Sequence, residues 1–136
     1  MEVVLDVNVF VSAVLSGAGP SAQLVAAMRA DRLFAVACPG LLAELGDVLR
    51  RDRFRRFLSL EEVDDCVGEI EALCRMLEDP EPVPQVLRDP DDDYLVALAY
   101  ECAAEAIVSG DLDLHEATNL SVTVLTPREA WRRLDG

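Results

Sequence analysis

The chain has 136 residues, of which 51% are hydrophobic, so it can bury a substantial core, and we expect one domain over residues 1–136. It carries 26 acidic and 12 basic residues, all of the latter arginine, for a formal net charge of −14. The absence of lysine excludes P-loop NTPases and Schiff-base enzymes, and the negative charge opposes nonspecific binding to nucleic acid.

Localisation and metal chemistry are constrained by what the chain lacks. The longest uninterrupted apolar run, residues 94–100, is far too short to cross a bilayer. The N-terminus contains Glu2 and Asp6 and lacks the basic start and long apolar stretch of a signal peptide. We therefore expect a cytoplasmic protein without membrane association. No Cys-x-x-Cys pair occurs and His115 is the only histidine, so we expect four buried free thiols rather than a zinc site.

The first elements alternate between strand and helix. Residues 3–5 are a β-branched run that predicts a buried strand ending at Asp6. Asn8 is expected to cap a helix that ends in the loop of residues 17–19. Pro20 then opens a second helix, because proline at the first helical position loses no hydrogen bond.

The middle of the chain predicts a strand followed by two helices. The strand covers residues 33–37, and the first helix begins at Pro39. Ser59 and Glu62 have the spacing of a capping box, which predicts the start of the second helix. The apolar spacing extends that helix to Leu77. The helix that begins at Pro39 has an apolar stripe of Leu41, Leu42, Leu45, Val48 and Leu49.

The last third begins with an extended connection over residues 79–90, which contains four prolines. We expect a helix over residues 91–103, strands over 106–109 and 122–125, and a final helix over 127–134. Because the strands alternate with helices and lack polar alternation, the pattern indicates a parallel sheet covered on both faces.

Four acidic residues stand where an α/β sheet binds ligands. Asp6 and Asp111 each follow a predicted strand, and ligands of open α/β sheets bind at the carboxyl ends of strands. Helical spacing places Glu44 on the flank of the apolar stripe, and Asp93 lies in the first turn of its helix. Each position alone also suits a turn, a cap or a solvated boundary. Together they favour a cation site, because carboxylates crowded in one cleft repel each other.

Four segments resemble, in the family's order, the motifs of PIN domains, the ribonuclease fold of VapC-type toxins in toxin–antitoxin pairs. They read VLDVNVFVSA (4–13), LLAEL (41–45), DYLVALA (93–99) and IVSGDLDL (107–114). The resemblance implies a three-layer α/β/α sandwich with a central, mainly parallel sheet. It also implies a metal-dependent endoribonuclease that acts on RNA, pairs with a small antitoxin protein and forms a homodimer.

The same resemblance assigns the catalytic and metal-binding roles to Asp6, Glu44, Asp93 and Asp111. Asp92 and Asp93 are alternatives, one residue apart, for the same inward-facing position, and Asp113 is an additional acid. Asn8 and Ser12, one helical turn apart, would be polar groups that support the metal ligands. Carboxylate oxygens suit Mg²⁺ or Mn²⁺, and a hard oxygen site without histidine argues against zinc.

Two arginine clusters provide local positive charge on a chain whose negative net charge opposes binding to nucleic acid. Arginine suits bidentate contacts to phosphate, although charge runs of this kind also commonly balance surface acids. One cluster lies in residues 50–56 and the other in residues 128–133; they contain Arg50, Arg51, Arg53, Arg55 and Arg56, and Arg128, Arg132 and Arg133.

Three other functions remain to be weighed. The chain could be a catalytically silent RNA-binding or protein-interaction module on the same fold, since fold does not determine function. Residues 6–8 resemble the Asp-x-Asp motif of haloacid-dehalogenase-like phosphatases, but Asn8 replaces the second acid and the supporting lysine is missing, as it is for a receiver domain. Serine or cysteine hydrolase chemistry would need His115 as base, and we interpret that residue as a surface or capping histidine.

Overall fold

The computed structural model describes residues 1–81, 93–116 and 120–135. Its five strands form one parallel sheet in the order β3-β2-β1-β4-β5. Val3 in the central strand is in register with Ala35 on one side and Ala106 on the other. The strands are β1 (Glu2–Leu5), β2 (Phe34–Ala37), β3 (Arg75–Met76), β4 (Ala106–Val108) and β5 (Thr123–Leu125).

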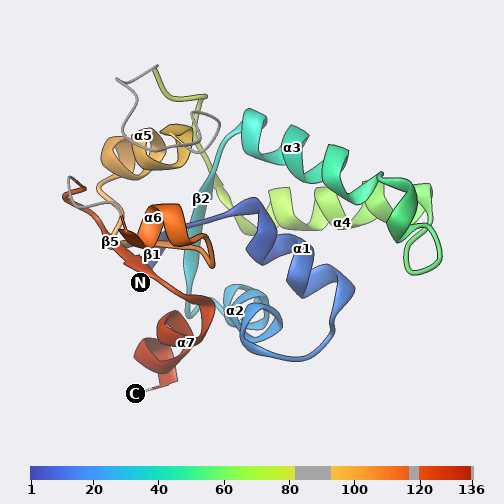
Figure 1. The fold of residues 1–136 in the computed structure, drawn as a ribbon, viewed down its shortest axis with the longest axis horizontal. Helices are drawn as coiled ribbons and strands as arrows, with labels where there is room; N and C mark the ends of the chain where they lie inside the picture. The colour runs from blue at the N-terminus through green and yellow to red at the C-terminus, as the bar shows by residue number, and fades with distance from the viewer. Residues whose placement is uncertain (82–92, 117–119, 136) are drawn as a thin grey trace.

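Helices cover the sheet on both faces. α5 contacts β1, β2 and β4, whereas α2 and α7 pack together on the opposite side (Figure 1). This arrangement confirms the predicted three-layer α/β/α architecture, with a sheet that is parallel throughout the described residues. The helices are α1 (Val7–Leu15), α2 (Pro20–Arg29), α3 (Pro39–Leu49), α4 (Leu60–Leu73), α5 (Asp93–Cys102), α6 (Leu112–Glu116) and α7 (Pro127–Asp135), with a 3₁₀ turn, η1 (Asp52–Phe54).

The central strands are apolar because both of their faces are covered. Val3, Val4 and Leu5 in β1 are 0% exposed, and all three residues of β4 are equally buried. Strands buried on two faces read as continuous hydrophobic runs rather than alternating ones. This composition places β1 and β4 side by side at the middle of the sheet, and their carboxyl ends therefore lie next to each other.

The start of α1 differs from the prediction. Asp6, and not Asn8, is the N-cap, and Val7 is the first helical residue. Asp6 Oδ1 accepts a hydrogen bond of 3.3 Å from the backbone N–H of Asn8, which satisfies one of the unpaired donors of the first turn. The helix therefore begins directly at the end of β1.

The prediction that the helix from Ser59 reaches Leu77 is wrong. The capping box of Ser59 and Glu62 is confirmed, but α4 ends at Leu73. The chain then forms β3, which pairs with β2, and Leu77 N donates to Ala37 O at 2.9 Å. The backbone of residues 75–77 pairs with the otherwise free edge of β2, and this long-range pairing outweighs the local helical spacing of the apolar residues.

Several smaller differences remain. α6 was not expected, and α5 ends at Cys102, before Ala103 adopts a left-handed φ of 52°. Most of the predicted extended connection, residues 82–90, and the expected helix start at residue 91 lie outside the described residues. All four cysteines are free, but only Cys38 is buried; Cys66, Cys74 and Cys102 are half-buried, because they pack against the edge of the core rather than within it.

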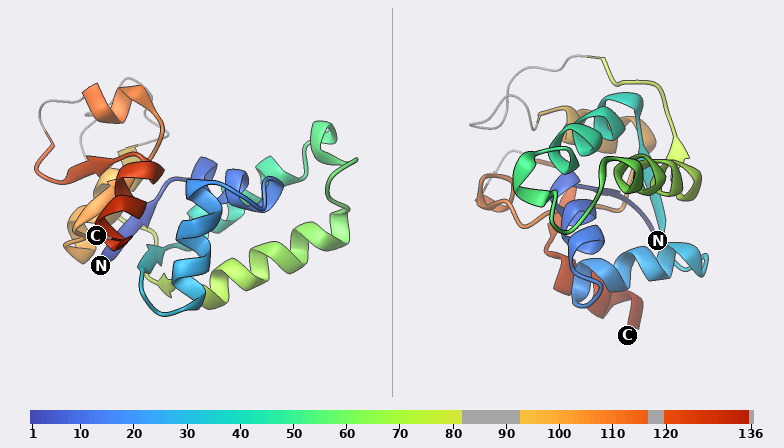
Figure 2. Two further views of the ribbon diagram at one scale, coloured as in Figure 1. Left: turned by 90° about the horizontal axis from the view of Figure 1, so that it is seen from below. Right: turned by 90° about the vertical axis from the view of Figure 1, so that its right-hand side faces the viewer.

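α3 and α4 pack against each other as an arm that projects from one side of the sheet (Figures 1 and 2). η1 lies at the free end of this arm, between the two helices. Across the described residues, no single helix is long and apolar enough to cross a membrane; α1 and α2 meet that test only as a pair bent by 95°.

Candidate active site

The first acidic residue of the site is buried at the junction of β1 and α1. Asp6 is only 7% exposed, and its backbone N–H donates to Val108 O of β4 at 2.9 Å. Its Oδ2 accepts a hydrogen bond of 2.7 Å from Ser109 Oγ. A buried carboxylate is tolerated because it is hydrogen-bonded on both oxygens, yet each oxygen keeps a lone pair for a further partner.

Ser109, which follows β4, joins Asp6 to Asp111. Its side chain is 0% exposed, and its Oγ donates to Asp6 while it accepts from the backbone N–H of Asp111 at 2.9 Å. The serine carbonyl lies 2.6 Å from His115 Nε2 on α6. Asp111 is half-buried and directly precedes α6, and its backbone is joined through the serine hydroxyl to Asp6 at the carboxyl edge of the sheet.

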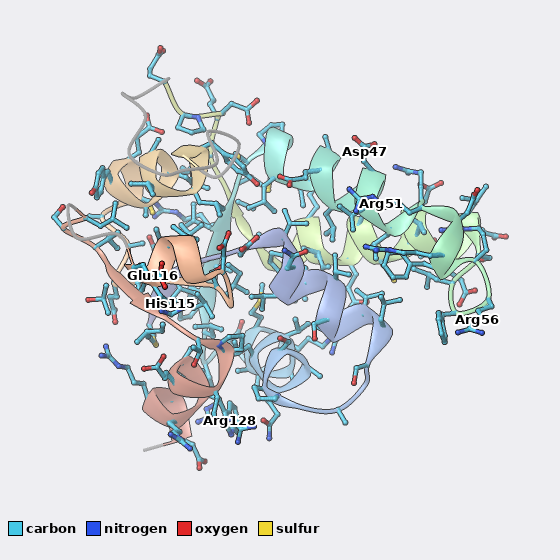
Figure 3. The ribbon with its side chains drawn as sticks, in the orientation of Figure 1. Asp47, Arg51, Arg56, His115, Glu116 and Arg128 are labelled. Carbon is cyan, nitrogen blue, oxygen red and sulfur yellow. The ribbon has the colours of Figure 1, made fainter. Side chains whose placement is uncertain are left out.

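Glu44 reaches the same region from α3. It is exposed, and its Oε2 accepts a hydrogen bond of 2.7 Å from the hydroxyl of Tyr94 on α5. Asp47, one turn further along α3, is also exposed and is shown in Figure 3. Glu44 is therefore anchored across two helices, which an ordinary boundary glutamate would not be.

Tyr94 is influenced by both Glu44 and Asp6. Its pKa is raised above the usual value by burial, by the hydrogen bond to Glu44, and by the negative charges of Glu44 and Asp6. The Tyr94 hydroxyl therefore lies within electrostatic range of both carboxylates. The hydroxyl thus stays protonated and continues to donate to Glu44 throughout the neutral range.

A further acidic residue, Asp79, accepts a backbone hydrogen bond at the amino-terminal end of α3. Asp79 Oδ1 accepts a hydrogen bond of 2.8 Å from Gly40 N, and a Cβ at position 40 would come within 3.1 Å of that oxygen. Gly40, Asp79, Pro80 and Tyr94 line a small pocket of about 200 Å³. Burial, together with Asp79, raises the pKa of the Cys38 thiol to about 11, so this thiol stays protonated at neutral pH.

The side chains of the other predicted acids lie outside the description. Asp93 is the first residue of α5, next to Tyr94, and Asp113 lies in α6, but the structure describes neither side chain, and Asp92 lies in an undescribed segment. Among the residues that it does describe, no three His, Cys, Asp or Glu side chains form a group able to hold an ion. Asn8 and Ser12 are both exposed on α1.

We call Asp6, Glu44 and Asp111, with Ser109 and Tyr94, the acidic edge. Sequence reasoning missed the two hydroxyl residues and Asp79. Tyr94 carried a weak signal, since it directly follows a predicted ligand, and Ser109 lies at a strand end. Asp79 had none, because its partner Gly40 lies 39 residues away.

Comparisons with known proteins agree with this fold. The family model described as PIN domain matches residues 2–113. The uncharacterized protein MJ1680 of Methanocaldococcus jannaschii is 26% identical over 138 residues, which cover 95% of this chain and 88% of that protein. A chain in the crystal structure of VapBC2 from Rickettsia felis, bound to a DNA fragment from their promoter, aligns with a TM-score of 0.61 at 12% identity; the alignment covers 91% of this chain and 98% of that one.

Proposed function

This chain belongs to the PIN domain family, and from that premise we propose that it is a divalent-metal-dependent endoribonuclease that hydrolyses RNA phosphodiester bonds. The observation that carries the proposal is the acidic edge itself. The carboxylates of Asp6 and Glu44 each accept a hydrogen bond from a hydroxyl group that leaves them acceptor capacity, and the backbone N–H of Asp111 donates to the same Ser109 hydroxyl that holds Asp6.

The donor set suits a hard cation. Asp6, Glu44, Asp93 and Asp111 would hold Mg²⁺ or Mn²⁺, with Asp92 as the alternative to Asp93 and Asp113 as an additional acid. Mg²⁺ commonly binds through one or two carboxylates and retains several waters, so a closed cage of protein ligands is not required. When bound, such an ion activates water for attack on phosphorus and stabilises the charge on the leaving oxygen.

The chain's own groups would orient the ligands. Ser109 keeps one oxygen of Asp6 fixed by donating to it, and Tyr94 does the same for Glu44. Partners of this kind hold ligating carboxylates in one orientation and raise metal affinity. Asn8 and Ser12 are exposed on α1, immediately after Asp6, where they would face water or substrate near the ion.

The first test is cleavage of a mixed RNA pool with Mn²⁺ or with EDTA. We expect cleavage only with the metal, and loss of cleavage in Asp6→Asn and Glu44→Gln. Asp47→Asn is the matched control, since it removes one negative charge from the same exposed side of α3 without touching Tyr94, and it should cleave as the unsubstituted protein does.

Each other outcome has a definite meaning. Cleavage in EDTA, or equal cleavage by Asp6→Asn, would overturn the proposal. RNA binding without cleavage under any metal condition would favour the catalytically silent binding module instead. Circular dichroism of each variant shows whether a loss reflects unfolding.

Metal binding has a second readout that does not depend on activity. An ion that binds only the folded state stabilises it by about 2.7 kcal/mol at a hundredfold excess over its dissociation constant. Mn²⁺ should therefore raise the melting temperature of the unsubstituted protein and of Asp47→Asn. Glu44→Gln and Asp6→Asn should show a smaller rise, and an unchanged melting temperature in the unsubstituted protein would count against the metal site.

We further propose that the protein acts in the cytoplasm as the toxin of a toxin–antitoxin pair, as a homodimer neutralised by a small antitoxin protein. Support comes from the family and from the likeness to a chain of the VapBC2 complex. Induced expression should arrest growth, and Asp6→Asn should relieve the arrest. Light scattering of the purified chain tests the dimer, and a monomer at micromolar concentration would contradict it.

A further inference from the structure

Positive charge is concentrated at the free end of the α3–α4 arm. Residues 50–56 contain five arginines and one aspartate, a net charge of +4, whereas the rest of the chain carries −18. We call this cluster the arginine tip; its members are Arg50, Arg51, Arg53, Arg55 and Arg56. The net charge of these seven residues is thus opposite in sign to that of the rest of the chain. Because clustered charge sets the local electrostatic potential, the tip favours binding of a polyanion.

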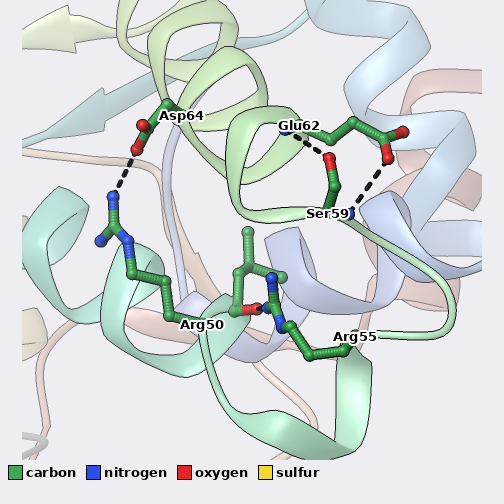
Figure 4. Close-up of polar contacts among 6 residues, drawn as sticks. Arg50, Arg55, Ser59, Glu62 and Asp64 are labelled. Carbon is green, nitrogen blue, oxygen red and sulfur yellow. Dashed lines mark hydrogen bonds and ion pairs between the residues drawn. The ribbon is translucent and has the colours of Figure 1, made fainter.

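Two of the five arginines hold the arm together. Arg50 Nη2 pairs with Asp64 on α4 at 2.5 Å, and Arg55 Nη2 donates to the Leu49 carbonyl at the end of α3 (Figure 4). The Arg55 Nε and Nη1 atoms are buried and have no hydrogen-bond partner in the described part of the chain. The structural role of these two residues leaves the other three to be explained.

Arg51, Arg53 and Arg56 point into solvent. All three are exposed, and none forms an ion pair with a carboxylate of residues 1–81, 93–116 or 120–135. The guanidinium of Arg53 lies 4.7 Å from the centre of the Phe54 ring, and the guanidinium of Arg56 lies 4.8 Å from the centre of the Phe57 ring. Stacking uses the face of the guanidinium and leaves its in-plane N–H donors free for bidentate contacts.

We propose that the arginine tip binds the phosphate groups of single-stranded RNA beside the cleavage site; this inference rests on the proposed ribonuclease function. A phosphate backbone explains three unpaired arginines on an otherwise acidic chain, since each can form two parallel N–H···O bonds with one phosphate. Phe57, which is 59% exposed, adds a ring on which a base can stack.

The position of the tip fits a strand that also reaches the acidic edge. α3 ends at Leu49, five residues after Glu44, so roughly 8 Å of helix axis separates Glu44 from the start of the tip at Arg50. That length corresponds to about two phosphates at the axial spacing of a stacked strand. A strand with its scissile phosphate at the acidic edge therefore passes the tip a few nucleotides away.

The arginines of α7 are placed differently. Arg32, which precedes β2, donates to Leu134 O at 3.0 Å, so the last turn of α7 lies at the amino edge of the sheet, away from Asp6. Arg132 and Arg133 belong to that turn, where cations favour the helix dipole. Figure 3 shows Arg56 at the free end of the arm and Arg128 beside α7, far from that end.

The test compares two variants that remove the same charge from these two places. Both are made in the Asp6→Asn background, so that binding is measured without cleavage. The tip variant is Arg51→Gln with Arg56→Gln, and the control is Arg132→Gln with Arg133→Gln. Binding to a fluorescein-labelled single-stranded oligouridylate is followed by anisotropy over a series of salt concentrations.

We expect the tip variant to bind roughly tenfold more weakly at low salt, and its slope of log K against log salt to fall in magnitude by about 1.4, or 0.7 for each lost phosphate contact. The control should match the Asp6→Asn parent. Equal affinity and slope for the two variants would overturn the inference, even if metal-dependent cleavage is established. A tip variant that keeps its RNA affinity but changes its oligomeric state would assign the tip to protein association instead.

Discussion

The acidic edge and the arginine tip lie near different parts of the same helix. Near the middle of α3, Glu44 accepts a hydrogen bond from Tyr94 of α5, whereas the arginines of the tip follow the carboxyl end of α3. The carboxylates of Asp6 and Glu44 are held by hydroxyl groups distant in sequence, and Asp6 is buried. In the tip, Arg53 and Arg56 lie over adjacent rings, and both of them and Arg51 are exposed. Substitutions at the edge should therefore cost both stability and cleavage, and those at the tip should change binding alone.

The largest stability effect should come from Ser109→Ala. This substitution removes the hydroxyl donor of a buried carboxylate, and hydrogen bonds to charged groups contribute about 1.5–3 kcal/mol. Urea denaturation measures the loss. Ser16→Ala is the control, since that exposed hydroxyl donates only to the carbonyl of Ala18, and its effect should stay within about 0.5 kcal/mol. Equal losses of stability for Ser109→Ala and Ser16→Ala would contradict the prediction that the serine of the acidic edge stabilises the fold more than a surface serine does.

Ser59→Ala should cost about 1 kcal/mol, because Ser59 caps the helix that supports the tip. The effect should depend on pH. Hydrogen bonds from Ser59 lower the pKa of Glu62 below its ordinary 4.5, so the stabilising contribution is present above that value and is lost as the pH falls through the lowered pKa. The bond from the Glu62 N–H to Ser59 Oγ joins neutral groups and persists in acid, so the difference in thermal unfolding between the two proteins should narrow only in part at low pH. Equal stability of the two proteins at neutral pH would contradict the cap.

Tyr94→Phe should destabilise the fold by about 0.5–1 kcal/mol, because Glu44 is exposed and water can replace the lost donor. Cleavage should fall further than stability does, because the freed carboxylate samples other rotamers. Chemical denaturation and single-turnover cleavage separate the two effects. The raised pKa of Tyr94 predicts no step in the pH–rate profile near the usual tyrosine value; a step there would show that the hydroxyl ionises.

The smallest effect on stability is expected for the tip variant itself. Arg51→Gln with Arg56→Gln removes exposed side chains that form no ion pair in the described parts of the chain, so unfolding should change by less than about 0.5 kcal/mol. Arg50→Gln is the comparison, since it breaks the contact to Asp64. A tip variant less stable than Arg50→Gln would show that the exposed arginines hold the arm together.

Local sequence signals predicted most of the architecture. The apolar runs of β1 and β4, Pro39 at the start of α3, and the Ser59–Glu62 box depend on neighbouring residues, and the structure contains all of them. β3 could not be predicted, because both of its residues are exposed and only the edge of β2 makes them a strand. Tertiary pairing therefore accounts for the missed strand.

At the acidic edge, too, the sequence predicted some features, whereas contacts distant along the chain were missed. The order of strands and helices was enough to bring Asp6, Glu44 and Asp111 to one edge. The hydroxyls that hold them were not predictable, since Ser109 meets Asp6 across 103 residues and Tyr94 meets Glu44 across 50. The metal-binding roles of these acids, and of Asp93, remain predictions.

The central position of β1 also determines when the acidic edge can be completed during synthesis. β1 leaves the ribosome early and can pair with β2, but its other edge must wait for β4, because Val3 pairs with Ala106. Ser109 arrives later still, so a nascent chain has Asp6 but not the group that orients it. A growing polypeptide of this protein thus carries an incomplete acidic edge until most of its length has emerged.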